Sequence, residues 1–182
     1  MGKKECSLHA KIQFYLNQTL IRKLRADDFE RIFEWENSEE LWLVSDESGP
    51  YSREIIAAFM DRCLTSDNPE TERWVIMNEM QEPVGVVDLL EIDYLFKSAG
   101  IGIFIANVAD RKKGYAKRAL FELISVLEKR KWNFIKALIH QDNIASASLF
   151  KSIGFSPGGQ QLHRGKLATQ YVYCIAINKN LE

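Results

Sequence analysis

A short basic sequence at residues 111–116 combines residue types that bind an anion. It reads Arg-Lys-Lys-Gly-Tyr-Ala and follows an apolar run at residues 101–106. The first turn of a helix has unpaired backbone N–H groups, and the helix dipole adds positive potential there. Gly114 lets a ligand approach the backbone, and Ala116 keeps the next turn uncluttered. We therefore expect a pyrophosphate cradle here, formed by Arg111, Lys112, Lys113, Gly114, Tyr115, Ala116 and Lys117.

Two common phosphate signatures do not match this sequence. A dinucleotide fingerprint needs three glycines, and a Walker loop needs Gly-Lys followed by Ser or Thr. A basic, solvated helix start is the plain alternative, because six-residue matches of this kind are common. A nucleic-acid patch would need positive charge that continues across the surface, and the sequence does not indicate one.

The surrounding elements predict how this segment is held. Strand and helix patterns alternate from residue 73 onward, after two shorter helices. Asp27 with Glu30 resembles a capping box for the first of these helices, and Ser52 can cap the second. The second helix would bury a stripe that includes Ile55 and Ile56. The predicted elements are, in order, a strand at 20–25, helices from 27 and from 52, strands at 74–77, 84–92 and 101–106, a helix at 114–131, a strand at 134–140, a helix at 143–153 stopped by Gly154, and strands near 160–162 and at 168–178.

Length and composition indicate one globular domain of 182 residues, 46% apolar and 27% charged. A net charge of −1 argues against a dedicated nucleic-acid binder. No apolar run approaches the roughly 20 residues that span a bilayer, and the chain start lacks the pattern of a secretion signal. Three dispersed cysteines and three histidines without ligand spacing predict reduced thiols, no metal site and a cytoplasmic location.

Charge is distributed unevenly along the chain. Residues 111–131 hold eight basic and two acidic side chains, a net charge of +6. Residues 27–54 hold ten acidic and two basic side chains, a net charge of −8. The positive segment suits a polyanionic nucleotide, and the negative segment would attract a cationic amine. Acidic helices are also often merely solvated.

A second short sequence pairs with the basic one. Residues 143–155 read N-x-x-S-x-x-L-F-x-x-x-G-F after a predicted strand. With R-x-x-G-x-A at residues 111–116, this order resembles the GNAT N-acetyltransferase superfamily over about residues 73–178. Residues 84–94 (VGVVDLLEIDY) look like bacterial spermidine N-acetyltransferases. The N-x-x-S variant and the segment from Trp35 to Ser52 look like the ribosomal-protein N-terminal acetyltransferases.

The resemblance implies an α/β fold with a mixed, mostly antiparallel central sheet, a splayed strand pair and about four flanking helices. Residues 1–182 would form one domain, with 1–72 as a helical acceptor-side arm and 73–178 as the acetyl-CoA-binding core. Pantetheine would insert between the splayed strands like an added strand, bonded by the backbone of Phe104, Ile105 and Ala106. Asn143 would bond a pantetheine amide with Ser146 close by, although Asn143 also fits a helix N-cap.

The implied reaction moves acetyl from acetyl-CoA directly to a primary amine of a polyamine, a protein N-terminus or another small amine. Because an ammonium has no lone pair, a base must first take a proton. Glu91 is the preferred base and Asp88 the second, although each could instead be a solvent-facing or structural carboxylate. Their odd separation points them to opposite faces of a regular strand unless a bulge intervenes. Asp46 and Glu47 are candidates for binding the cationic acceptor.

One position departs from the spermidine acetyltransferase pattern. Those enzymes carry a tyrosine seven residues after the asparagine, thought to protonate the departing thiolate, and this chain has Phe150 there. We expect Phe150 to pack in the core, with Tyr171 or Tyr173 as candidate replacements. A thiol with a pKa of about 8.5 can also leave as the thiolate, so activity is not excluded.

Two other functions therefore stay open. One is a non-catalytic acyl-CoA-binding or regulatory module, which the absent tyrosine favours. The other is a phosphate-binding module for a different nucleotide. An exposed sheet edge would make a homo-oligomer unsurprising.

Overall fold

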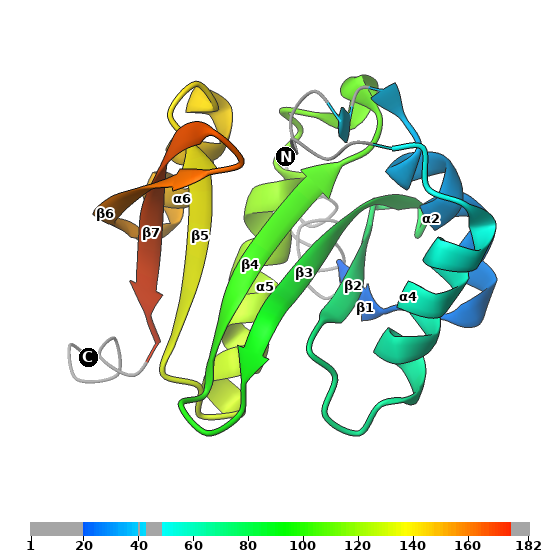
Figure 1. The fold of residues 1–182 in the computed structure, drawn as a ribbon, viewed down its shortest axis with the longest axis horizontal. Helices are drawn as coiled ribbons and strands as arrows, with labels where there is room; N and C mark the ends of the chain where they lie inside the picture. Colours follow the sequence, from blue (N-terminus) through cyan, green and yellow to red (C-terminus); the bar gives the residue numbers. More distant parts are fainter. Residues whose placement is uncertain (1–19, 40, 43–48, 176–182) are drawn as a thin grey trace, which may run out of the picture.

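The computed structural model describes residues 20–39, 41–42 and 49–175. Within these residues, seven strands form one sheet in the order β1-β2-β3-β4-β5-β7-β6 (Figure 1). The strands are β1 Ile21–Lys23, β2 Glu72–Met77, β3 Pro83–Asp93, β4 Ser98–Ile105, β5 Phe134–His140, β6 Ser156–His163 and β7 Lys166–Cys174. Every neighbouring pair is antiparallel except β4 and β5, which are parallel. The predicted mixed, mostly antiparallel sheet is confirmed.

The parallel pair β4–β5 is joined for only part of its length. Residues 98–100 of β4 pair with residues 134–136 of β5, and the pairing stops there. Beyond that point β4 continues to pair with β3 as far as Ile105, and β5 continues to pair with β7 as far as His140. The two strands diverge toward the end at which β4 stops (Figure 1). The predicted splayed pair is therefore present, with two strand edges that have no partner strand among the residues described above.

Helices cover both faces of the sheet. The described part of the chain has four α-helices and two short 3-10 helices: η1 Ala26–Asp28, α2 Phe29–Glu36, α4 Arg53–Thr65, η2 Val108–Asp110, α5 Tyr115–Lys129 and α6 Ile144–Ile153. One apolar cluster joins α5 and α6 to one face of the sheet, and a second joins α2 and α4 to the other face. Strand alternation supplies both clusters, since Val86 and Val87 are adjacent, fully buried and in different clusters.

Local signals at the helix ends are partly confirmed. Ser52 caps α4, with its hydroxyl accepting from the Ile55 amide at 3.4 Å. Gly154 ends α6 in a left-handed conformation, at φ 108°. The predicted buried stripe of α4 is wrong at Ile55, whose side chain is exposed, and right at Ile56, which is buried.

The predicted capping box at Asp27 and Glu30 is also wrong. Residues 26–28 form a 3-10 turn before α2, and the carboxylate that accepts from the Arg25 amide, at 2.9 Å, is that of Asp28. The Arg22 guanidinium fixes this arrangement, because it donates to both oxygens of Asp28 at 2.7 Å.

Gly85 marks the closest approach between β3 and β4. A Cβ built on this residue would meet the carbonyl oxygen of Phe104, which belongs to the partner backbone and cannot rotate away. We expect Gly85→Ala to lower the free energy of unfolding by about 1–3 kcal/mol, as overpacking does, measured by urea unfolding. The matched control is Gly159→Ala in β6, where the added methyl group meets open space. Equal effects of the two substitutions would contradict this account of the strand pair.

Candidate active site

The start of α5 presents backbone N–H groups that the described protein does not use. The first α-helical hydrogen bond of α5 runs from the Arg118 amide to the Gly114 oxygen, at 3.0 Å. Within the described residues, the amides of residues 114–117 have no hydrogen-bond acceptor, and the first turn holds no acidic side chain. Gly114 is left-handed, at φ 89°, and nothing lies within 4 Å of the position of a Cβ. This end of α5 therefore combines free donors, the positive end of the dipole and open space.

The four predicted cations around this helix start differ in their surroundings. Lys113 pairs with Asp110 at 2.8 Å. The ammonium of Lys117 lies 5.9 Å from the centre of the Phe121 ring. Lys112 is exposed and has no ion-pair partner among the described residues. Lys112 and Lys117 are therefore the lysines most available to a phosphate group.

Arg111 fastens the loop to the end of β4. Its Nε donates to the Ile105 oxygen at 3.1 Å, and its Nη2 donates to the Ala106 oxygen at 3.3 Å. These bonds satisfy two carbonyl groups at the point where the strand ends. The guanidinium therefore sets where the cradle begins relative to the splayed strands.

The edge of β4 that faces the gap is set by strand alternation. The Ala106 amide donates to the Val84 oxygen at 2.9 Å, so Ala106 directs its backbone toward β3. Phe104, two residues earlier, does the same. Ile101 and Ile103 alternate with these residues and direct their backbone groups away from β3, toward β5. The pairing of Gly100 with Lys136 uses the Ile101 N–H, so the Ile101 oxygen and the backbone of Ile103 are the groups that face the gap. Among the predicted backbone contacts the structure thus favours the Ile105 amide, and it adds two residues that sequence reasoning missed.

Glu79 is a further residue that sequence reasoning missed. It lies in the turn between β2 and β3 and accepts from the Tyr115 hydroxyl at 2.8 Å and from Arg118 Nη1 at 2.7 Å. The Arg118 hydrogen bond lowers the pKa of Glu79, so the carboxylate stays ionised. Burial and the bond to Glu79 raise the pKa of Tyr115 to about 12. The Tyr115 side chain therefore anchors the first turn of α5, and only its backbone amide is free for a ligand.

Asn143 lies where β5 leads into α6, beside the gap. Its Oδ1 accepts from the Ser146 amide at 3.0 Å, which confirms the helix N-cap. Its side-chain NH₂ group has no acceptor within the described residues. The cap fixes the orientation of the side-chain amide and leaves its donor end available.

The two predicted bases have very different surroundings. Asp88 is buried, and its two oxygens accept from Nε and Nη2 of Arg73 at 2.9 and 2.7 Å. Arg73 also donates to Glu36 of α2 at 2.5 Å and lies 4.6 Å from the centre of the Phe59 ring. Burial lowers the pKa of Arg73, but the charges and hydrogen bonds of Asp88 and Glu36 together raise it more, so the net shift is upward. Asp88 is thus committed to a buried ion pair, which disfavours it as a base.

Glu91 has the opposite character. It sits in a bulge at φ 47°, where the β3–β4 register shifts, so regular alternation does not hold. Its side chain is 80% exposed, and Lys136 of β5 lies 3.7 Å from its carboxylate. Gly100, where β4 and β5 part, pairs with both Leu90 and Lys136. Glu91 is therefore an accessible carboxylate beside the closed end of the gap.

The aromatic residues near α6 and β7 mostly pack. Phe150 is buried, and its ring packs edge to face against Phe155 with 4.9 Å between the ring centres. This confirms the expected core role. Tyr171 and Tyr173 are on β7, and β5 lies between β7 and the gap. Neither is placed to replace the missing tyrosine.

The acidic segment is less negative than its composition indicates. Asp28 pairs with Arg22, and Glu36 pairs with Arg73, so two of its charges are neutralised by arginines from outside residues 27–54. Asp46 and Glu47, the predicted acceptor-binding residues, lie outside the described residues.

None of the helices in the described residues combines the length and the apolar character needed to cross a bilayer. Within the same residues, no three histidine, cysteine, aspartate or glutamate side chains cluster as a metal site would require.

Removing one partner of the buried Arg73–Asp88 pair should destabilise the fold. We expect Asp88→Asn to lower the free energy of unfolding by about 3–5 kcal/mol, because the Arg73 charge stays buried with a weaker partner set. The matched control is Glu91→Gln, which removes only an exposed carboxylate and should change stability by less than about 0.5 kcal/mol. Urea unfolding measures both, and a fully stable Asp88→Asn protein would show that the pair does not support the sheet.

Comparisons with known proteins place this geometry in a family. A family model described as an acetyltransferase (GNAT) domain matches residues 18–156. A search of curated proteins finds no match. A solved spermidine N-acetyltransferase from Vibrio cholerae, in complex with CoA and spermine, superposes with a TM-score of 0.77 at 18% identity, covering 86% of this chain and 95% of that one. A dodecameric structure of spermidine N-acetyltransferase from the same organism superposes with a TM-score of 0.71 at 18% identity. It covers 89% of this chain and 95% of that one.

At these identities the structural likeness shows the fold, and the family model shows the family. The matched residues include the splayed strands, the open start of α5 and the capped start of α6. Acetyl-CoA is the acetyl donor of this family, and transfer of that acetyl group is its reaction. The chain belongs to the GNAT family of acetyltransferases.

Proposed function

We propose that this enzyme acetylates a primary amine of a polyamine, using acetyl-CoA as the donor. The observation that carries the proposal is the gap between β4 and β5, with unpaired strand edges on both sides and free helix amides at its open end. This arrangement suits a ligand with an amide-bearing arm and an anionic head. We also propose one domain over residues 1–182, with 1–72 as the acceptor-side arm and 73–178 as the donor-binding core.

The residues around the gap fit coenzyme A. The free amides of residues 114–117, with Lys112 and Lys117, would hold the pyrophosphate. The Ile101 oxygen, the Ile105 N–H and the free amide group of Asn143 would pair with the two amides of pantetheine. Acetyl-CoA supplies the activated acetyl thioester. The protein has to orient this thioester, keep other groups away from it, and remove one proton from the acceptor ammonium.

Glu91 would accept that proton. Its exposed carboxylate beside the closed end of the gap can take a proton from the acceptor ammonium, directly or through a water molecule. The N–H group of Ile103 can stabilise negative charge on the carbonyl oxygen. Since Phe150 carries no hydroxyl, the thiolate leaves unaided or takes its proton from water.

Direct transfer also agrees with the state of the Cys63 thiol on α4. Burial raises the pKa of Cys63 to about 11, so the thiol stays protonated at neutral pH. A protonated thiol is a poor nucleophile, so an acetylated cysteine is not an attractive relay.

Two observations favour a polyamine as the acceptor. The similar solved structures are spermidine N-acetyltransferases, one with spermine bound. Exposed acidic residues without an ion-pair partner among the described residues, Asp27, Glu34 and Glu39, lie on the side of the sheet that carries α2. We propose that Asp46 and Glu47 extend this acidic surface, because long-range attraction favours a multivalent cation over a neutral amine. We further propose a cytoplasmic enzyme that forms a homo-oligomer, as one relative is dodecameric.

A non-catalytic acyl-CoA-binding module is the second candidate, favoured by Phe150. Thiol release from acetyl-CoA distinguishes the two, assayed with spermidine, spermine, a peptide N-terminus and an amino sugar. We expect turnover to be fastest with the polyamines, with a KM that rises as salt screens the attraction. Binding of coenzyme A without turnover on any of these amines would instead establish the module.

Gly114→Ala should weaken coenzyme A binding because the methyl group occupies the open space before the free amides. We expect Kd to rise about tenfold or more, a difference of about 1.4 kcal/mol, by calorimetry. The matched control is Gly165→Ala in the β6–β7 turn, which is also left-handed with open space around the Cβ. It carries the same backbone strain far from the cradle and should leave Kd unchanged. Equal Kd values for both variants would argue against phosphate binding at Gly114.

Glu91→Gln should lower kcat about 100-fold or more, the usual loss when a general base is removed, and leave coenzyme A binding unchanged. Glu70→Gln, at an exposed position outside the gap, is the control for removal of an exposed carboxylate. A Glu91→Gln enzyme with full kcat would require another base.

A further inference from the structure

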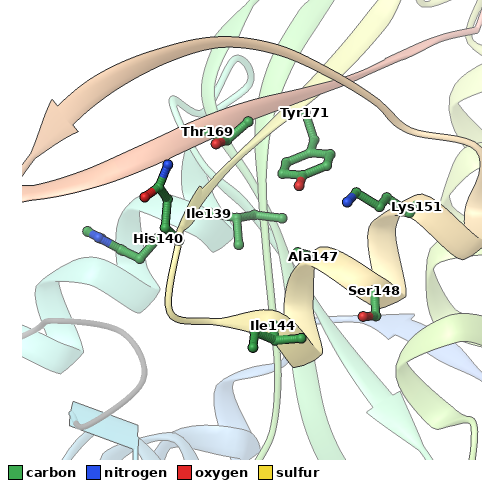
Figure 2. A pocket seen from close by; sticks show the side chains of 9 residues that line it. Ile139, His140, Ile144, Ala147, Ser148, Lys151, Thr169 and Tyr171 are labelled. Carbon is green, nitrogen blue, oxygen red and sulfur yellow. The ribbon is translucent and has the colours of Figure 1, made fainter.

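A separate hollow of about 390 Å³ lies on the other side of β5 from the gap (Figure 2). It is bounded by α6, by the end of β5 and by Thr169 and Tyr171 of β7. None of the residues that line the hollow belongs to β4. A volume of this size is within the range of small-molecule sites.

Tyr171 is the unusual residue of this hollow. Tyr171 is only 6% exposed, and its hydroxyl has no hydrogen-bond partner within the described residues. Figure 2 shows the hydroxyl directed into the hollow, toward α6. The hydroxyl is not one of the fully buried polar atoms that have no partner, so it faces the open hollow and can bond a ligand there.

The charged residue that lines the hollow indicates which charge a ligand there would carry. Lys151 of α6 extends toward Tyr171 (Figure 2), with its ammonium 5.8 Å from the ring centre. Lys151 has no ion-pair partner among the described residues. Hydroxyls of Ser148 and Thr169 also line the hollow, and no acidic side chain does. An unpaired cation beside hydroxyl donors favours an anion.

The rest of the lining is mixed, since His140 and Gln141 add polar groups beside three apolar residues. Ile139 of β5 is buried, Ala147 is half-buried, and Ile144 is 72% exposed at the rim. An exposed isoleucine beside a polar hollow offers apolar contact to a ligand that is larger than its charged group. A purely inorganic ion would leave this surface uncovered.

We propose that this hollow is a second ligand site, which binds a small organic anion separately from the donor. A carboxylate or phosphate group of the ligand pairs with Lys151 and accepts from the Tyr171 hydroxyl. Its apolar body lies on Ile139, Ala147 and Ile144.

An amide NMR titration tests this site with phenyl phosphate, benzoate and inorganic phosphate as probes, on the full chain with and without saturating coenzyme A. We expect saturable shifts at residues 147–151 and 169–171 in both states, with tighter binding of phenyl phosphate than of inorganic phosphate. Lys151→Ala should weaken phenyl phosphate binding at least about fivefold, and Tyr171→Phe about threefold, the size of one lost hydrogen bond. Tyr171→Phe keeps the packed ring and so keeps the fold. Lys129→Ala, an exposed lysine on α5, should leave the affinity unchanged.

Three results would overturn the proposal. They are shifts that do not saturate, affinities that neither Lys151→Ala nor Tyr171→Phe alters, and shifts that disappear once coenzyme A is bound. The last result would assign the hollow to the donor's own site. The readout needs no acetyl transfer, so its outcome is independent of the acceptor proposed above.

Discussion

The pairing of β4 governs what this protein can bind. β4 is bonded to β3 along its length but to β5 for only three residues, so two strand edges face each other without a partner. Unpaired backbone groups are costly unless water or a ligand satisfies them. The chain that leaves β4 turns at Gly114 directly into α5, whose first amides are equally unpaired. An extended arm and an anionic head are thus accommodated by one continuous set of backbone donors and acceptors.

Side chains keep this backbone arrangement in place from two sides. Arg111 ties the loop to the last carbonyls of β4, and Glu79 ties the first turn of α5 to the β2–β3 turn. On the opposite face, Arg73 joins β2 to Asp88 of β3 and to Glu36 of α2. Helix α2 is thereby fixed relative to the strand that carries Glu91. Charged residues that look suited to chemistry in the sequence are here used largely to position the elements.

Much of the architecture could be predicted because it depends on local patterns. The strand at 134–140, the cap at Asn143 and the stop at Gly154 follow from apolar periodicity and capping chemistry, and all three are confirmed. What could not be predicted depends on register and on distant partners. Ile103, rather than Phe104, directs its backbone toward the gap, because Phe104 and its alternate neighbours in β4 bond to Val84 and the neighbours of Val84 in β3. No local signal in the sequence gives that register. The commitment of Asp88 to Arg73, fifteen residues away, is invisible for the same reason.

Hydrogen exchange of the backbone amides, with and without coenzyme A, tests the central claim most directly. If the gap and the helix start hold the donor, binding should protect the amides of residues 114–117 together with those of Ile103 and Ile105, while the amides of β1 and β2 stay as they were. Protection spread evenly over the sheet, or none at the start of α5, would contradict the claim that this gap is the donor site.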